Sequence, residues 1–150
     1  MPLPPSPVPW LICSQTAAAL STFFLAVLLN PSAQQRAQAE LDAVVGHDRL
    51  PTLGDRDNLP YVRALCSEIL RWNPTAPLGL PHRLIQDDAY NKYFLPAGSV
   101  FFVNIRKLLR DPRRYADPEA FRPERFLGEP EFAPEKIVFG FGRRCASLSK

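Results

Sequence analysis

Prolines limit the length of every regular element that this chain can form. The sequence has 17 prolines among 150 residues, which is about twice the usual share. Proline lacks a backbone N–H and its ring clashes with the preceding helical turn, so helices and central strands rarely continue through it. Because the prolines recur along the whole sequence, we expect a mainly α fold with a small β component and many irregular connections.

The bulk composition is that of one modest globular domain, since 46% of the residues are hydrophobic and 22% are charged. The formal net charge is +3, and this small excess gives little support to nucleic-acid binding. One basic cluster stands out, which we interpret as either a solvated face or a docking patch for an acidic partner. It consists of Arg106, Lys107, Arg110, Arg113 and Arg114.

The three cysteines, Cys13, Cys66 and Cys145, are far apart and form no Cys-x-x-Cys pair. This spacing predicts neither a disulfide framework nor a zinc site, and it fits a reducing intracellular compartment. A free cysteine is usually a small buried apolar residue, which is our interpretation for Cys13 and Cys66. Cys145 differs because it ends a basic loop with regularly spaced glycines.

An uncharged segment of 19 residues, Leu11–Leu29, follows a proline-rich tail at residues 1–10. Its length reaches that of a membrane span, but polar residues interrupt it and no basic residue precedes it. A secretory signal is therefore not expected. Two interpretations stay open, a membrane helix and a core helix of a larger protein. We expect the helix over Cys13–Leu29, because Pro7 and Pro9 oppose an earlier start.

Apolar residues at helical spacing predict two further helices. The first covers Pro31–Val45, with Asn30 as its N-cap and Gly46 as its left-handed stop. The second begins at Pro60 and ends at Asn73, and its apolar stripe is expected to be buried. That stripe consists of Val62, Leu65, Cys66 and Ile69.

Downstream, the sequence favours three strands, a short helix and a meander without regular elements. The second and third strands are expected to pair as a hairpin across Pro96-Ala97-Gly98. The expected segments are strands at Pro81–Ile85, Lys92–Leu95 and Ser99–Asn104, a helix at Ile105–Arg110 and a meander at Asp111–Pro134.

Three motifs in a fixed order carry the functional information. Glu68 and Arg71 lie three residues apart on a predicted helix, so they can pair along one face. They are followed by Phe121-Arg122-Pro123-Glu124-Arg125-Phe126 and by Phe139-Gly140-Phe141-Gly142-Arg143-Arg144-Cys145. In this order the motifs resemble the Glu-x-x-Arg helix, the Pro-Glu-Arg-Phe meander and the haem-binding loop of the cytochrome P450 family. The segments Arg71-Trp72-Asn73-Pro74 and Pro81-His82-Arg83 look like those of fungal members.

This resemblance implies a partial cytochrome P450 fold, with residues 11–150 as the C-terminal portion of such a domain. It also implies that Glu68, Arg71 and Arg125 form a buried charge triad that locks the helix to the meander beneath the haem. A buried triad tolerates no missing partner, because an uncompensated buried charge costs several kcal/mol. Glu119 and Arg122 repeat the spacing of the pair, and we expect them to form an ordinary surface ion pair.

By the same resemblance, haem is the cofactor and four residues bind it. Arg83 and Arg144 match positions that face the haem propionates, while Phe139 and Gly142 belong to the haem-binding loop. Cys145 is the candidate iron ligand, whose thiolate would favour O–O cleavage.

The loop departs from the family pattern, which places the cysteine two residues after the arginine. Cys145 directly follows Arg144, and residues 146–150 lack the glycine expected after the ligand. We therefore expect a chain that is truncated in the haem loop and impaired in catalysis.

The oxygen-activating helix of the family carries an acid followed by threonine, where this sequence has Gln15 and Thr16. Thr16 is accordingly the candidate catalytic hydroxyl, although one register places Gln15 at the position of the threonine. The missing acid predicts weaker proton delivery to bound oxygen. The match also favours a core helix for Leu11–Leu29.

The activity implied by the resemblance is that of a haem-dependent monooxygenase, which inserts one oxygen atom from O₂ into a small organic substrate. Full-length relatives receive electrons from an NADPH-dependent reductase at the endoplasmic reticulum membrane. Two alternatives stay open for this chain. One is a catalytically inactive remnant without haem, and the other is a small membrane-anchored interaction protein.

Overall fold

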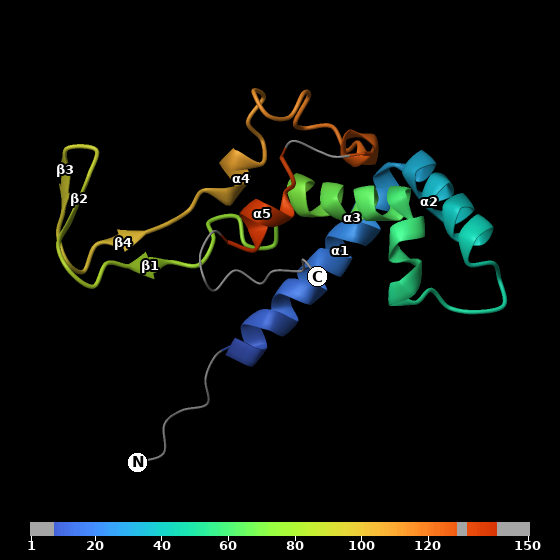
Figure 1. The fold of residues 1–150 in the computed structure, drawn as a ribbon, viewed down its shortest axis with the longest axis horizontal. Helices are drawn as coiled ribbons and strands as arrows, with labels where there is room; N and C mark the ends of the chain where they lie inside the picture. Colours follow the sequence, from blue (N-terminus) through green and yellow to red (C-terminus); the bar gives the residue numbers. More distant parts are fainter. Residues whose placement is uncertain (1–7, 129–131, 141–150) are drawn as a thin grey trace, which may run out of the picture.

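The computed structural model describes residues 8–128 and 132–140, with side chains from Gln15 onward. Five α-helices, two short 3₁₀ helices and four short strands are present in this part of the chain (Figure 1). In chain order they are α1 (Val8–Leu29), α2 (Pro31–Val44), η1 (Leu53–Asn58), α3 (Pro60–Trp72), β1 (His82–Arg83), β2 (Asp88–Tyr90), β3 (Tyr93–Leu95), β4 (Val100–Phe101), α4 (Ile105–Leu108), η2 (Pro123–Phe126) and α5 (Glu135–Val138).

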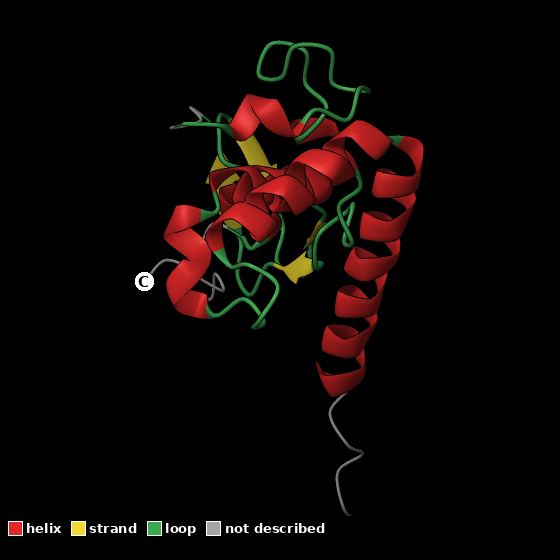
Figure 2. Ribbon diagram, turned by 90° about the vertical axis from the view of Figure 1, so that its right-hand side faces the viewer, coloured by secondary structure: helices red, strands yellow, loops and turns green. Residues whose placement is uncertain are grey.

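Helix α1 begins at Val8, five residues before the expected start and inside the segment expected to be a tail. Pro9 therefore lies in the first turn, where its missing N–H would have no helical partner in any case. Figure 2 shows α1 as a long helix along one side of the remaining elements. Its exposed surface carries large apolar side chains, among them Phe24 and Leu28.

No single helix in the described residues is long and apolar enough to cross a membrane. Residues Gln15–Leu29 and Pro31–Val44 together satisfy the length and composition of a span, but the chain bends by 107° between them. Proline at the first position of α2 explains the sharp break, because α1 cannot continue through it.

Asn30 precedes α2 as predicted, but its side chain does not cap that helix. Its amide Nδ2 instead donates a hydrogen bond of 2.9 Å to the carbonyl of Ala26 in the last turn of α1. The C-terminal prediction was better, since Gly46 adopts a left-handed φ of +76° directly after Val45, the C-cap of α2. Glycine adopts this conformation without the steric cost of a Cβ.

Helix α3 is the central element, and it packs against α1, α2, η1, η2 and α5. One apolar cluster contains Tyr61, Leu65 and Ile69 together with Ala33 and Ala37 of α2. A second cluster contains Ala64 of α3 and the buried residues of later elements. These are Ile105, Leu109, Tyr115, Phe126 and Ile137.

The predicted apolar stripe of α3 is only partly correct. Leu65 and Ile69 are buried and Val62 is half-buried, but Cys66 is exposed. The buried surface is instead completed by two charged residues, Glu68 and Arg71. A pattern of apolar residues could not predict this, because the helix turns a polar pair toward the interior.

The predicted pairing of the strands was wrong. Strand β3 pairs with β2, with Tyr90 opposite Tyr93, and the segment Pro96-Ala97-Gly98 leads on to β4. The turn between β2 and β3 is formed by Asn91 and Lys92, whose φ angles are +50° and +72°. Two successive left-handed residues form the tight turn that suits twisted antiparallel strands.

The second strand pair joins β1 to β4, with His82 opposite Phe101 and Arg83 opposite Val100. Figure 1 shows the four strands as an arm that extends away from the helices. The expected meander contains the 3₁₀ helix η2, and the expected helix at Ile105–Arg110 is observed as α4, which ends at Leu108. The prediction of a mainly α fold with a small β component is confirmed.

Candidate functional site

Two charged side chains of α3 lie at the centre of the described structure. Glu68 and Arg71 are three residues apart and face the same side of the helix, as this spacing requires. Arg71 Nε donates to Glu68 Oε2 over 2.7 Å, and Arg71 Nη2 donates to Oε1 over 2.8 Å. Both side chains have an exposed fraction of 0%. The paired, charge-assisted geometry is the kind needed to hold ions away from water.

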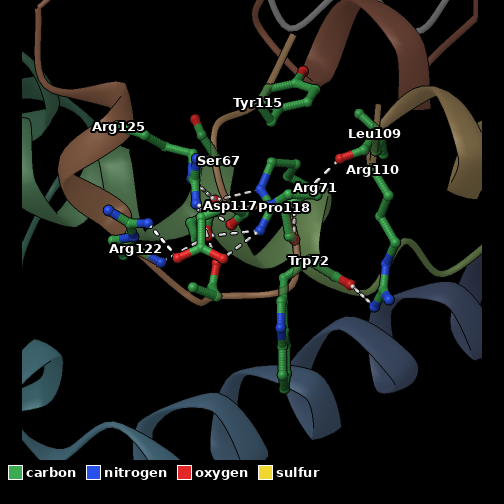
Figure 3. Close-up of polar contacts among 12 residues, drawn as sticks. Ser67, Arg71, Trp72, Leu109, Arg110, Tyr115, Asp117, Pro118, Arg122 and Arg125 are labelled. Carbon is green, nitrogen blue, oxygen red and sulfur yellow. Dashed lines mark hydrogen bonds and ion pairs between the residues drawn. The ribbon is translucent and has the colours of Figure 1, made fainter. Parts of the chain in front are cut away.

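The remaining donors of Arg71 bind backbone carbonyls at the end of α4 and in the meander (Figure 3). Nη1 donates to the carbonyls of Leu109 and Pro118, over 3.1 and 2.7 Å, and Nη2 donates to the carbonyl of Ala120 over 3.1 Å. A guanidinium has five N–H donors, so each donor of Arg71 has a partner. Because these carbonyls come from irregular backbone, Arg71 replaces the hydrogen bonds that a helix or sheet would have supplied.

Arg125 of η2 joins the same carboxylate from the other side. Its Nε lies 3.3 Å from Glu68 Oε1 and 3.2 Å from Oε2. Its other donors bind the carbonyls of Ala116, Asp117 and Ala120. The structure therefore brings the three residues of the predicted triad together.

Two further contributors to this site were not predicted from the sequence. The backbone N–H of Arg122 donates to Glu68 Oε1 over 2.7 Å, so the carboxylate binds two guanidinium groups and one peptide group. The carbonyl of Ala120 accepts from both Arg71 and Arg125. No side-chain pattern signals such backbone partners, although Asp-Pro at Asp117 and Pro118 does predict a turn there.

The predicted surface pair of Glu119 and Arg122 is not observed. Glu119 pairs with Arg110, and Arg122 pairs with Asp117. Arg110 also donates from Nη2 to the carbonyl of Trp72 over 3.1 Å, while Trp72 Nε1 donates to the carbonyl of Glu119 over 3.1 Å. These contacts attach the end of α3 to the meander a second time.

The short helix α5 leads from the meander to the predicted haem loop. The hydroxyl of Ser67 on α3 donates to the carboxylate of Glu135 in the first turn of α5. The hydroxyl of Tyr115 donates to the carbonyl of Phe132 over 3.1 Å, just before the helix. Phe139 is half-buried and follows α5 directly.

Arg83 is exposed at the end of β1, in a pocket that Leu84, Ile85, Ala97 and Gly98 complete. In the part of the chain that the structure describes, no acidic side chain pairs with its guanidinium. Gly98 has a φ of +87°, and a Cβ there would lie 3.5 Å from Arg83 Nη2, in packing contact with the guanidinium. An exposed guanidinium with no acidic partner among these residues suits a carboxylate ligand, as the haem propionates are.

The other predicted site residues lie apart from this geometry or outside the described residues. Thr16 is exposed on α1. Gly142, Arg144 and Cys145 fall in residues 141–150, which the structure does not describe. Among residues 15–128 and 132–140, no group of three or more His, Cys, Asp or Glu side chains could hold a metal ion.

Comparisons with known proteins agree on one family. The family model for cytochrome P450 matches residues 14–145. Cytochrome P450 monooxygenase 208 of Postia placenta is 56% identical over 133 residues, which cover 86% of this chain and 26% of that protein. Cytochrome P450 monooxygenase claR of Ampulloclitocybe clavipes is 47% identical over 132 residues, which cover 85% of this chain and 25% of that protein. The chain thus spans about a quarter of the length of these relatives.

Solved structures lead to the same family. A zebra fish cytochrome P450 structure with progesterone matches with a TM-score of 0.78 and 39% identity, over 87% of this chain and 30% of that chain. A second zebra fish structure, with abiraterone, has a TM-score of 0.76 and 38% identity, over 85% of this chain and 30% of that chain. The expected resemblance and the expected partial fold are both confirmed.

Proposed function

This chain belongs to the cytochrome P450 family, and we propose that it forms the haem-side C-terminal portion of a monooxygenase acting on a small organic substrate. The observation that carries the proposal is the buried contact among Glu68, Arg71 and Arg125. This contact fixes α3 to the meander, and the meander leads through α5 to the loop that ends at Cys145. We also propose that these three residues lock the helix to the meander beneath a haem.

Haem, when bound, would supply the iron centre that activates O₂. Arg83 fits this cofactor because its guanidinium is exposed and has no acidic partner in the described residues. Its planar fork would hold a propionate through paired hydrogen bonds, and Arg144 would bind the other propionate. Phe139 and Gly142 would frame the haem loop, and Cys145 is the proposed iron ligand.

Helix α1 has two proposed roles, one for a hydroxyl that it carries and one for its exposed apolar surface. Thr16 lies on this helix and is the proposed hydroxyl for proton delivery to oxygen. The apolar surface of α1, which includes Phe24 and Leu28 with exposed fractions of 61% and 75%, suits packing against further protein or a membrane. Exposed apolar surface of this kind is typical of an interaction surface.

The proposed partners follow from family membership. A monooxygenase reaction consumes electrons, so we propose an NADPH-dependent reductase as the electron donor. We further propose that the whole protein acts at the endoplasmic reticulum membrane. The substrate is proposed only as a class, a small organic molecule.

The reduced carbon-monoxide difference spectrum tests this function. Haem would be added to the wild-type chain, to Cys145→Ala and to Cys66→Ala. Cys66 is exposed on α3 and is not part of the predicted loop sequence, so it is the matched control. We expect a thiolate-type Soret band in the wild type and in Cys66→Ala, and its loss in Cys145→Ala. If the wild type lacks this band, no thiolate-ligated haem is formed. That result would support the alternative that the chain is an inactive remnant.

A further inference from the structure

Tyr115 connects the buried charge cluster to the start of the haem loop. The residue is buried, and the guanidinium of Arg71 lies 5.5 Å from the centre of its ring. Its ring also meets the ring of Phe126 edge to face at 6.3 Å. On its other side, the hydroxyl donates to the carbonyl of Phe132 over 3.1 Å. One side chain therefore touches both the cluster and the segment that enters α5, as Figure 3 shows for Tyr115 and Arg71.

Arg114, the residue before Tyr115, also contacts Phe132. The guanidinium of Arg114 lies over the ring of Phe132, 4.8 Å from its centre. Arg114 thus contacts the ring of Phe132, and Tyr115 binds its carbonyl. Cation–ring contacts and hydrogen bonds are each modest, but both act on the backbone two residues before the fully buried Pro134.

The position of these two residues is itself fixed by a turn. The carbonyl of Asp111 accepts from the backbone N–H of Arg114 over 3.0 Å and from that of Tyr115 over 2.9 Å. Arg71 binds the carbonyl of Leu109 two residues earlier. Backbone hydrogen bonds therefore fix Tyr115 relative to Arg71, in addition to the contact between the guanidinium and the ring.

The segment beyond Phe132 is held by hydrogen bonds within its own turn and by packing against α3 and α4. The N–H groups of Ile137 and Val138 both bind the carbonyl of Pro134, and that of Phe139 binds the carbonyl of Glu135. These bonds are internal to one helical turn. Ser67 holds Glu135 from α3, and Ile137 packs in the same apolar cluster as Tyr115.

We propose that Tyr115 is a positioning residue for the haem-binding loop. Through its hydroxyl, Tyr115 fixes the position of residues 132–140 relative to the buried Arg71. This inference rests on the proposed function, because it assigns that hydroxyl a role in presenting the loop that begins at Phe139. The ring alone cannot make the hydrogen bond to the carbonyl of Phe132, because the hydroxyl is its donor. Burial raises the pKa of Tyr115 above its ordinary value, so the hydroxyl keeps its proton and remains a donor.

The test compares two tyrosines that each lose one hydroxyl. Tyr115→Phe removes the bond to Phe132, and Tyr61→Phe is the control, because Tyr61 is equally buried and donates to Glu124 in η2 over 3.2 Å. Amide hydrogen exchange is measured at residues 137–140 and, for comparison, at Leu65 and Ile69 of α3. In Tyr115→Phe we expect exchange at 137–140 to rise roughly tenfold, with α3 unchanged. Tyr61→Phe should leave residues 137–140 within roughly twofold of the wild type.

The inference is overturned if both variants change residues 137–140 equally, or if Tyr115→Phe raises exchange in α3 as much as in α5. Either result would make the hydroxyl a general stabilising group. Haem titration then separates this inference from the proposed function. A raised dissociation constant in Tyr115→Phe alone is the expected result, while a wild type that binds no haem refutes the proposed function and leaves the exchange data to decide the role of Tyr115.

Discussion

Arg71 donates two hydrogen bonds to the carboxylate of Glu68, over 2.7 and 2.8 Å, at a place where neither side chain touches solvent. A buried ion pair is weak evidence for stability, because removing two charges from water costs as much as their attraction returns. Its value here is specificity. Only a backbone path that brings the carbonyls of Leu109, Pro118 and Ala120 to the remaining donors leaves no N–H of Arg71 without a partner.

Replacing Arg71 with lysine should destabilise the chain although the charge is kept. Lysine has a single ammonium group and cannot reproduce the planar fork that binds Glu68 and three carbonyls. We expect Arg71→Lys to lower the free energy of unfolding by about 3 kcal/mol in urea denaturation. Arg106→Lys is the control, since Arg106 is exposed on α4, and should change the free energy of unfolding by less than about 0.5 kcal/mol. Equal effects would contradict the role of the fork.

Asp111 should make part of the stability depend on acid pH. Hydrogen bonds from Arg113 hold the pKa of this carboxyl at about 2, below the unfolded value of about 3.9. The depressed pKa means that the contribution is fully present above pH ~4 and is lost as the pH falls through ~2. The difference in urea midpoint between wild type and Asp111→Asn should be constant above that window and shrink within it. A difference that does not vary with pH would contradict this assignment.

The β2–β3 turn should improve when lysine is replaced by glycine. Lys92 has a φ of +72°, where a side chain costs free energy and glycine does not. We expect Lys92→Gly to raise the free energy of unfolding by about 0.5–1 kcal/mol, provided that the arm unfolds with the helices. Lys107→Gly in α4 is the opposite control and should lower it by a similar amount. Thermal unfolding measures both, and destabilisation by Lys92→Gly would argue against the left-handed turn.

The helices could be predicted from local chemistry, because prolines and one glycine mark their ends. Pro31, Pro60 and Gly46 lie where α2 and α3 start or α2 stops. Strand pairing could not be predicted in this way. Pro96-Ala97-Gly98 is a strong turn signal, but the hairpin turn itself is Asn91 and Lys92, where only the asparagine has a known tendency to adopt left-handed φ.

The charged residues of the site could be found from the spacing of Glu68 and Arg71 and from the order of the motifs. Their partners could not, since Arg71 and Arg125 bind mostly backbone carbonyls of irregular segments. Any residue type supplies the same carbonyl, so the sequence carries no mark of it. The exposed position of Cys66 was missed for a related reason. The buried Glu68 and Arg71 determine which side of α3 faces the interior, and Cys66 lies outside that side.

Urea denaturation of Glu68→Gln shows whether the buried cluster around Glu68 holds α3 to the meander. Glutamine keeps the shape but removes the negative charge that pairs with the guanidinium groups of Arg71 and Arg125. We predict a loss of about 3–5 kcal/mol in the free energy of unfolding, against less than about 1 kcal/mol for Glu119→Gln, whose side chain is 70% exposed. Similar small losses in both variants would mean that the cluster does not hold α3 to the meander.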